Sequence, residues 1–238
     1  MIEAISFKNI VNKVNDELKK ASARITFYDS VDPVSRNAMA EINKKIKRHN
    51  FIGVMFCNPN TTFCKNEILL HLNYFHHRSG KYINFFCCGY GAYWPEGRYK
   101  DQQVVASIDG TAWSYSNQAF VSVLCEFEKT TKWKYSGENE LLLLDVSPSR
   151  DDKLNINSAI VCNLEAMNRD KAFTSVRSFF EDIIRYSVTG KNANGWQFSD
   201  RKGGEVAKNY LKETVLSLLP KTLQDTYKKA ENYAIRQI

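Results

Sequence analysis

The chain of 238 residues is 43% hydrophobic and 25% charged, a composition that is ordinary for a folded globular protein and excludes wholesale disorder. Its apolar runs are much shorter than the roughly 20 residues that cross a bilayer, so we expect neither a membrane span nor a membrane partner. The formal net charge of +7 is concentrated in residues 1–100 and 201–238, which suggests an acidic partner such as nucleic acid, unless the lysine-rich faces merely keep helices solvated.

Two helices are expected at the N-terminus. Apolar residues recur at spacings of three and four, which predicts the first helix over residues 7–25. This stripe consists of Phe7, Val11, Val14, Leu18, Ala21 and Ile25. A second helix is expected after Asp32-Pro33, because a capping residue followed by proline is typical of a helix start.

The core begins with a strand, a helix and a second strand. Residues 51–57 form a short, continuously apolar run bounded by polar turns, which predicts a buried strand. A helix is expected over residues 61–77 and a second buried strand over residues 82–88. This βαβ pattern predicts a parallel pair of strands joined by a crossover helix.

The second half of the chain continues to alternate. Further strands are expected over residues 104–108, 140–146 and 159–164, although the last stretch is also compatible with a helix start. Helices are expected over residues 116–130 and 171–186, followed by a surface loop over 188–204 and two closing helices.

This order of elements favours an α/β protein with a three-layer Rossmann-like fold, a mostly parallel central sheet and flanking N- and C-terminal helices. No linker-like segment interrupts the chain, so a single domain is expected. Its parts are an N-terminal helical segment (1–50) packed on the core, the α/β core (51–190), and a loop with the C-terminal helices (191–238).

The cytoplasm is the expected location. The N-terminus shows no basic leader followed by an apolar block. The six cysteines include no CxxC pair, which gives no support to a zinc ribbon or a thioredoxin-type redox motif. Most of them lie in apolar runs, where a free thiol behaves as a small hydrophobic group.

Turns that follow strands are the candidate ligand site, because ligands of open parallel sheets bind beyond the C-terminal strand ends. The candidate ligand-binding residues in these turns are Asn58, Asn60, Thr61, Cys88, Gly89, Tyr90, Gly91 and Ser147. The first turn precedes a helix N-terminus, which attracts anions, and the glycines allow close approach of a ligand to the backbone. The alternative is a plain turn, with Asn60 or Thr61 as a helix cap.

Tryptophans extend this candidate site. Trp94, Trp113, Trp133 and Trp196 all fall in segments that we interpret as polar connections, near tyrosines and cations. Aromatic side chains interleaved with cations can stack bases and hold phosphates, so Trp94 and Trp113 join the candidate ligand-binding residues. The alternative is that the indoles cover the ends of the sheet.

Two aspartates at strand ends, Asp109 and Asp145, are the candidate catalytic residues, because a carboxylate there can act as acid, base or Mg²⁺ ligand. Residues 145–149 (DVSPS) resemble the DxSxS metal-binding motif of von Willebrand A domains. In that family the motif follows the first strand, whereas here it follows a late one, so no metal site is predicted. No particular cofactor is indicated.

These features favour an intracellular protein that binds or senses a nucleotide-type or nucleic-acid ligand at the C-terminal edge of its sheet. One alternative is an enzyme of nucleotide or phosphoester chemistry. Another is a non-catalytic subunit that forms a homo-oligomer, or binds a protein partner, through its terminal helices. Bacterial defence against phage is a background hypothesis that no residue supports. The proposed site requires the strands at 51, 82 and 141 to run in the same direction.

Overall fold

The computed structural model describes most of the core and part of each end of the chain. The described residues are 2–4, 6–27, 51–80, 82–147, 153–189, 197–198 and 201–202. The helix expected after Asp32-Pro33, the two closing helices and most of the loop expected over 188–204 lie outside these residues. Within the described part, no helix combines the length and the apolar character needed to span a membrane.

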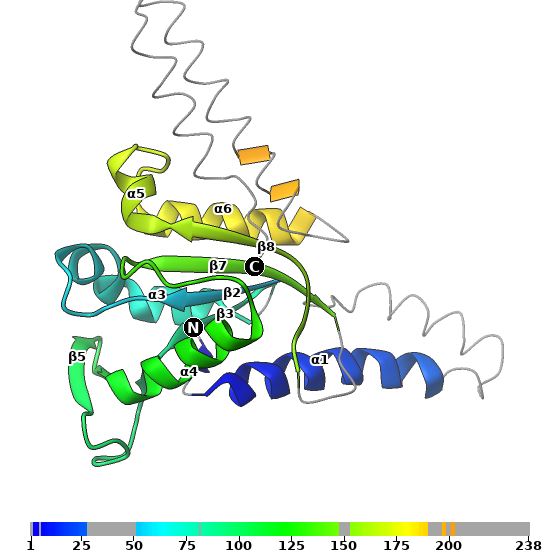
Figure 1. The fold of residues 1–238 in the computed structure, drawn as a ribbon, viewed down its shortest axis with the longest axis horizontal. Coiled ribbons are helices and arrows are strands. Elements are labelled where there is room, and N and C mark those ends of the chain that lie inside the picture. Colours follow the sequence, from blue (N-terminus) through cyan, green and yellow to red (C-terminus); the bar gives the residue numbers. More distant parts are fainter. Residues whose placement is uncertain are drawn as a thin grey trace, which may run out of the picture.

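A five-stranded sheet, sheet A, forms the centre of the molecule (Figure 1). In spatial order its strands are β1 (Ile2–Ala4), β3 (Asn84–Cys88), β2 (Phe51–Phe56), β7 (Glu140–Ser147) and β8 (Asn155–Asn163). β3 runs parallel to β1 and β2, whereas β7 is antiparallel to β2 and β8. The parallel pair predicted from the strands at 51 and 82 is therefore confirmed.

The predicted Rossmann-like fold with a mostly parallel sheet is wrong. Residues 148–154 join β7 to β8, and this connection is too short for a parallel pair, which needs a crossover of about a dozen residues or more. The continuous apolar run of β7 suggested a parallel strand. Burial on both faces explains that run equally well, because Leu141–Leu144 are fully buried within antiparallel pairs.

The sequence patterns do not predict the second, three-stranded sheet, sheet B. Its antiparallel strands are β4 (Tyr90–Ala92), β6 (Thr111–Tyr115) and β5 (Gln103–Ile108), in that spatial order. Asp109 and Gly110 have φ angles of 49° and 77° and form the two-residue turn between β5 and β6. Asp-Gly favours such a hairpin turn, so this dipeptide marks a hairpin rather than only a strand end.

The helices agree with the expectations in part. α1 (Phe7–Phe27) and α4 (Asn117–Thr130) lie where the apolar stripes predict them. The helix expected over 61–77 is instead a π-helical turn, η2 (Cys64–Ile68), a 3-10 turn, η3 (Leu69–His71), and α3 (Leu72–Arg78). α5 (Leu164–Arg169) follows β8. α6 (Val176–Thr189) begins later than expected, because Lys171 has a positive φ of 53° and Ser175 Oγ caps the helix by accepting the N–H of Ser178.

Helices cover both faces of sheet A (Figure 1). On one face, the Phe180 ring of α6 lies 4.5 Å, between centroids, from both Phe75 of α3 and Phe85 of β3. On the other face, the Phe127 ring of α4 lies 5.6 Å from that of Phe56 of β2, and α1 packs on α4. α3 and α6 are therefore neighbours on one face of the sheet.

Candidate functional site

The ends of the three strands predicted at 51, 82 and 141 do not meet at one edge of sheet A. The turn over residues 57–61 follows β2 and the turn over 88–91 follows the parallel strand β3, so these two turns share one edge of sheet A. Asp145 pairs with Phe51, the first residue of β2, because β7 is antiparallel to β2. Asp145 and Ser147 therefore lie at the opposite end of the sheet, and the requirement that all three strands run in one direction is not met.

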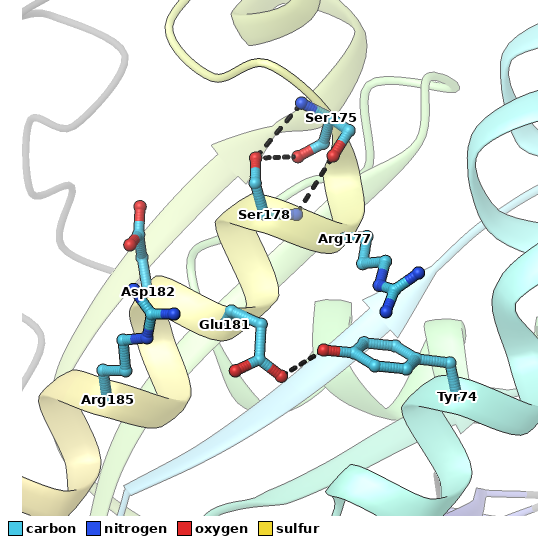
Figure 2. A pocket seen from close by; sticks show the side chains of 7 residues that line it. All are labelled: Tyr74, Ser175, Arg177, Ser178, Glu181, Asp182 and Arg185. Atoms are coloured by element: carbon cyan, nitrogen blue, oxygen red, sulfur yellow. Dashed lines mark hydrogen bonds between the residues drawn. The ribbon is translucent and has the colours of Figure 1, made fainter.

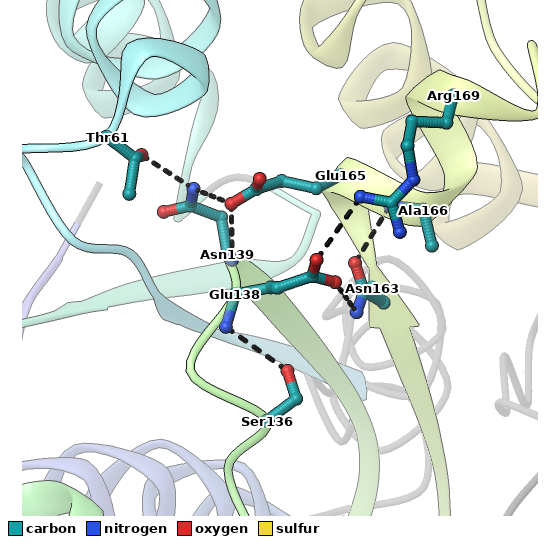
Figure 3. Close-up of polar contacts among 8 residues, drawn as sticks. All are labelled: Thr61, Ser136, Glu138, Asn139, Asn163, Glu165, Ala166 and Arg169. Atoms are coloured by element: carbon teal, nitrogen blue, oxygen red, sulfur yellow. Dashed lines mark hydrogen bonds and ion pairs between the residues drawn. The ribbon is translucent and has the colours of Figure 1, made fainter.

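A buried amide, that of Asn139, holds the turn after β2 (Figure 3). Its Oδ1 accepts the backbone N–H of Asn58 at 3.0 Å. Its Nδ2 donates to Thr61 Oγ1 at 2.9 Å and to Glu165 Oε1 at 2.6 Å. We call Asn58, Thr61, Asn139 and Glu165 the strand-end network. It joins the end of β2 to the start of β7 and to α5.

Hydrogen bonds within this turn agree with the alternative interpretation, in which the turn caps the following helix. Thr61 Oγ1 accepts the N–H of Cys64 at 3.1 Å, so Thr61 is the cap of the following helical turn. The N–H of Asn60 donates to Asn58 Oδ1 at 2.9 Å, and the Asn60 side chain is exposed. Asn58 and Thr61 thus have structural roles in this turn, whereas Asn60 contributes only its backbone N–H.

A second set of contacts lies beside this network (Figure 3). The Glu138 carboxylate accepts hydrogen bonds from Asn163 Nδ2 at 2.6 Å and from Arg169 at 3.2 Å. The bond from Asn163 is the main reason that the pKa of Glu138 lies below its ordinary value. Asn163 Oδ1 also accepts the N–H of Ala166 and caps α5. The charged and amide groups here are therefore bonded to one another.

The block at residues 88–91 connects the two sheets and is deeply buried. Burial raises the pKa of the Cys88 thiol well above its ordinary value, so the thiol stays protonated and is a poor nucleophile. The Tyr90 hydroxyl donates to the backbone carbonyl of Cys57 at 3.0 Å, and burial raises its pKa as well. These side chains belong to the core.

The two glycines of this block permit close packing inside the protein. A Cβ added at Gly89 would lie 2.7 Å from Phe120 Cβ. A Cβ at Gly91 would lie 1.9 Å from Trp94 Nε1, because the indole covers this glycine. The close approach predicted from these glycines is therefore to residues of the chain itself.

The described tryptophans are buried. Trp113 lies on β6 rather than in a connection, and its Nε1 donates to Asn73 Oδ1 at 2.7 Å. Trp133 Nε1 donates to the buried Glu140 carboxylate at 3.1 Å. Trp196 lies outside the described residues. The indoles that the structure describes pack against the sheets, as the alternative interpretation expects.

The two candidate catalytic aspartates lie in different sheets. Asp109 is exposed at the tip of the β5–β6 hairpin, and Asp145 lies within β7. The Ser147 hydroxyl donates to Asn157 Oδ1 at 3.2 Å. The last two residues of the DxSxS pattern are outside the described part, in which no three His, Cys, Asp or Glu side chains are placed to hold a metal ion.

A polar pocket of about 450 Å³ lies between α3 and α6 (Figure 2), on helices rather than at the strand ends. We call it the α3–α6 pocket. Its lining residues are Tyr74, Ser175, Arg177, Ser178, Glu181, Asp182 and Arg185. Its volume falls in the range of about 300–1,000 Å³ that is usual for small-molecule sites.

Glu181 is the centre of the contacts that hold this pocket together. Arg78 donates to both of its carboxylate oxygens, at 2.7 and 2.8 Å. The Tyr74 hydroxyl donates to Oε1 (Figure 2). The bidentate bond from Arg78 is the main reason that the pKa of Glu181 is lowered and that of Arg78 is raised. Glu181 therefore stays ionised and bridges α6 to α3.

Arg177 and Arg185 supply positive charge to the pocket without forming an ion pair in the described part of the chain, although the charge of Arg185 helps to lower the pKa of Glu181. The Arg177 guanidinium lies over the Tyr74 ring, 4.1 Å from its centroid. Among the residues that the structure describes, neither arginine has a carboxylate within ion-pair distance. Asp182, in contrast, pairs with Lys202 at 2.9 Å. Guanidinium groups without an acid partner are suited to bind carboxylate or phosphate groups.

The start of α6 contributes little to such binding, because the N–H groups of Val176 and Ser178 are already bonded. Ser175 Oγ accepts the N–H of Ser178 at 3.1 Å, and Ser178 Oγ accepts that of Ser175 at 3.2 Å. The Glu67 carboxylate accepts the N–H of Val176 at 3.3 Å. The capacity of the pocket for anions therefore depends on Arg177 and Arg185.

The pocket residues are absent from the sequence-based candidates, although α6 carries a signal. Arg177, Glu181 and Arg185 follow one another at spacings of four, which places them on one stripe of the helix. The apolar residues of the same helix predict its buried side and say nothing about this stripe. The partners on α3, Tyr74 and Arg78, are more than 100 positions away in the sequence.

Comparisons with known proteins identify no relative: no family model matches the chain, and neither a curated protein nor a solved structure matches it. Function is therefore inferred from the chemistry of the α3–α6 pocket.

Proposed function

We propose that the chain is a binding protein for a small phosphorylated ligand, nucleotides included, which it holds in the α3–α6 pocket. The observation that carries this proposal is the pair Arg177 and Arg185, which line the pocket without a described carboxylate partner. A phosphate group offers oxygens in the geometry that guanidinium groups bind best. The nucleotide-type ligand expected from the sequence is kept as a proposal, but at this site instead of the strand ends.

Binding is favoured over catalysis because the groups that could transfer protons are engaged with each other. The Tyr74 hydroxyl donates to Glu181, and Arg78 lowers the pKa of that carboxyl. A carboxylate with a lowered pKa is a weak base near neutral pH. For the enzyme alternative, Asp109 lies at a hairpin tip of sheet B and Asp145 in β7 of sheet A, so the two do not share the strand-end edge on which that alternative was based.

One alternative is that the chain is a subunit that assembles through its terminal helices. The N-terminal helix gives this alternative little support. In the described part of α1, the stripe residues Val11 and Val14 are fully buried within the chain itself. The Phe7 ring of α1 contacts Phe127 of α4 at 5.1 Å between centroids. The stripe of α1 over residues 7–14 is thus covered by the chain's own core.

The test is calorimetric titration with AMP, glucose 6-phosphate and pyrophosphate. Removing both guanidinium groups, in Arg177→Ala/Arg185→Ala, should weaken binding at least tenfold, because a hydrogen bond to a charged group contributes about 1.5–3 kcal/mol. Arg98→Ala/Arg169→Ala is the matched control, since it removes the same charge from two arginines outside the pocket. The control should bind like the unmodified chain.

Two outcomes contradict the proposal. One is that none of the three ligands gives saturable binding at millimolar concentration. The other is that the pocket variant and the control variant bind equally well, since binding would then occur elsewhere. Thermal melting of all variants shows whether a lost signal reflects unfolding.

A further inference from the structure

The charges that line the α3–α6 pocket alternate along α6. Arg177, Glu181 and Arg185 give the order positive, negative, positive on one stripe of the helix. Figure 2 shows the two arginines on opposite sides of Glu181. Eight residues of α-helix span about 12 Å along the axis, so the two guanidinium groups start from positions about 12 Å apart.

This alternation disfavours one anion bound at the centre. Such an anion would face the Glu181 carboxylate, which remains ionised because Arg78 lowers its pKa. Like charges in contact destabilise each other, so anionic groups are favoured at the two ends, next to Arg177 and next to Arg185. The pocket therefore offers two anion subsites that are separated by a carboxylate.

The centre of the pocket is suited to accept hydrogen bonds. An ionised carboxylate has about four acceptor positions, and Arg78 and Tyr74 use three of those of Glu181. The neighbouring Asp182 forms an ion pair with Lys202. A ligand group that lies between the two anion subsites should therefore be a donor, and a hydroxyl group fits this requirement.

We propose that the ligand is a polyhydroxylated molecule with a phosphate group at each end, such as a sugar bisphosphate. The terminal phosphates bind Arg177 and Arg185, and the hydroxyl groups between them donate to Glu181 and Asp182. The pocket volume of about 450 Å³ accommodates a molecule of this size. This inference rests on the proposed function and narrows its ligand class.

The test compares matched ligands: glucose 1-phosphate, glucose 6-phosphate and glucose 1,6-bisphosphate. In calorimetric titration the bisphosphate should bind at least tenfold more tightly than either monophosphate. Arg177→Gln and Arg185→Gln should each reduce the affinity for the bisphosphate to about that of a monophosphate. Arg169→Gln is the control, and it should leave all three affinities unchanged.

Two further ligands test the spacing and the central donor separately. Pyrophosphate has its anionic groups side by side, so it should depend strongly on only one of the two pocket arginines. Hexane-1,6-diol bisphosphate has two terminal phosphates and no free hydroxyl groups, so it should bind several-fold more weakly than glucose 1,6-bisphosphate.

The outcomes separate this inference from the proposed function. If the monophosphates bind in an arginine-dependent manner and the bisphosphate binds no more tightly, the inference is wrong and the proposed function stands. If pyrophosphate depends on both arginines as strongly as the bisphosphate does, the spacing argument is wrong. If no phosphorylated ligand binds, both fail. Should a Gln variant melt early, Arg177→Lys or Arg185→Lys, which keeps the charge but loses the bidentate fork, provides the same comparison.

Discussion

The strand-end network and the α3–α6 pocket are both polar, but they differ in what their polar groups already bind. In the network, the Asn139 amide is fully buried and bonded to the backbone of Asn58 and to two side chains. In the pocket, Arg177 and Arg185 have no carboxylate partner among the described residues. The hydrogen-bonding groups of the network are therefore already paired within the fold, whereas two guanidinium groups of the pocket form no ion pair with the described residues.

This difference shows why polar residues at strand ends are weak evidence for a ligand site. A buried polar group must be hydrogen-bonded, and a turn between a strand and a helix provides donors that need acceptors. Thr61 and Asn139 meet that need inside the protein. Polar groups that are already bonded within the protein are therefore poor candidates for a ligand site.

The largest effect is expected for Asn139→Ala, which breaks the network. The backbone N–H of Asn58 loses its acceptor and Glu165 loses a donor, so the free energy of unfolding should fall by about 2–4 kcal/mol. Urea denaturation measures this loss. Asn168→Ala, at an exposed position on the neighbouring helix, is the control and should change stability by less than about 0.5 kcal/mol.

Ligand binding by the Asn139 variant sharpens the comparison. At a temperature where Asn139→Ala is still folded, it should bind phosphorylated ligands like the unmodified chain. A small loss of stability together with a large loss of binding would instead identify the network as the ligand site.

An intermediate effect is expected for Glu181→Gln, which removes the carboxylate charge that links α6 to α3 at the pocket. The ion pair with Arg78 is partly exposed, so its loss should cost about 1 kcal/mol at pH 7. The pKa of Glu181 is lower in the folded chain than in the unfolded chain. Its contribution is therefore complete above about pH 4.3, the ordinary value for Glu, and is lost as the pH falls through the folded value.

Parallel urea titrations of the two proteins from pH 7 down to pH 3 measure this dependence. The difference in stability should be constant at the upper end and should shrink below about pH 4. A difference that grew with decreasing pH would contradict the assigned role of Arg78.

The smallest effect is expected for Asp109→Asn. Asp109 has a φ of 49° at an exposed hairpin tip, and Asn accepts this conformation as readily as Asp. Its unfolding free energy should change by less than about 0.5 kcal/mol, and its ligand affinity should not change. If the variant melts at the normal temperature but no longer binds the ligand, Asp109 is again a candidate functional residue.

Several secondary-structure elements were predictable because their signals are local. The apolar stripes of α1 and α4 and the continuous apolar runs of β2 and β3 report burial directly. The hairpin of sheet B also had a local signal in Asp109-Gly110, but only its first strand follows from the patterns. The apolar run of β7 indicates that the strand is buried but not which way it runs. For this reason the predicted parallel sheet was wrong.

The amino-acid sequence by itself thus determined where α1, α4, β2 and β3 lie and that they are buried, because apolar periodicity and apolar runs act over a few neighbouring residues. Tertiary structure decided the direction of β7 and which polar side chains find partners. Asn58 and Asn139 are 81 positions apart, and Arg78 and Glu181 are 103 apart. No local pattern connects residues at such distances, so only the folded chain separates groups that are already bonded from groups that remain available to a ligand.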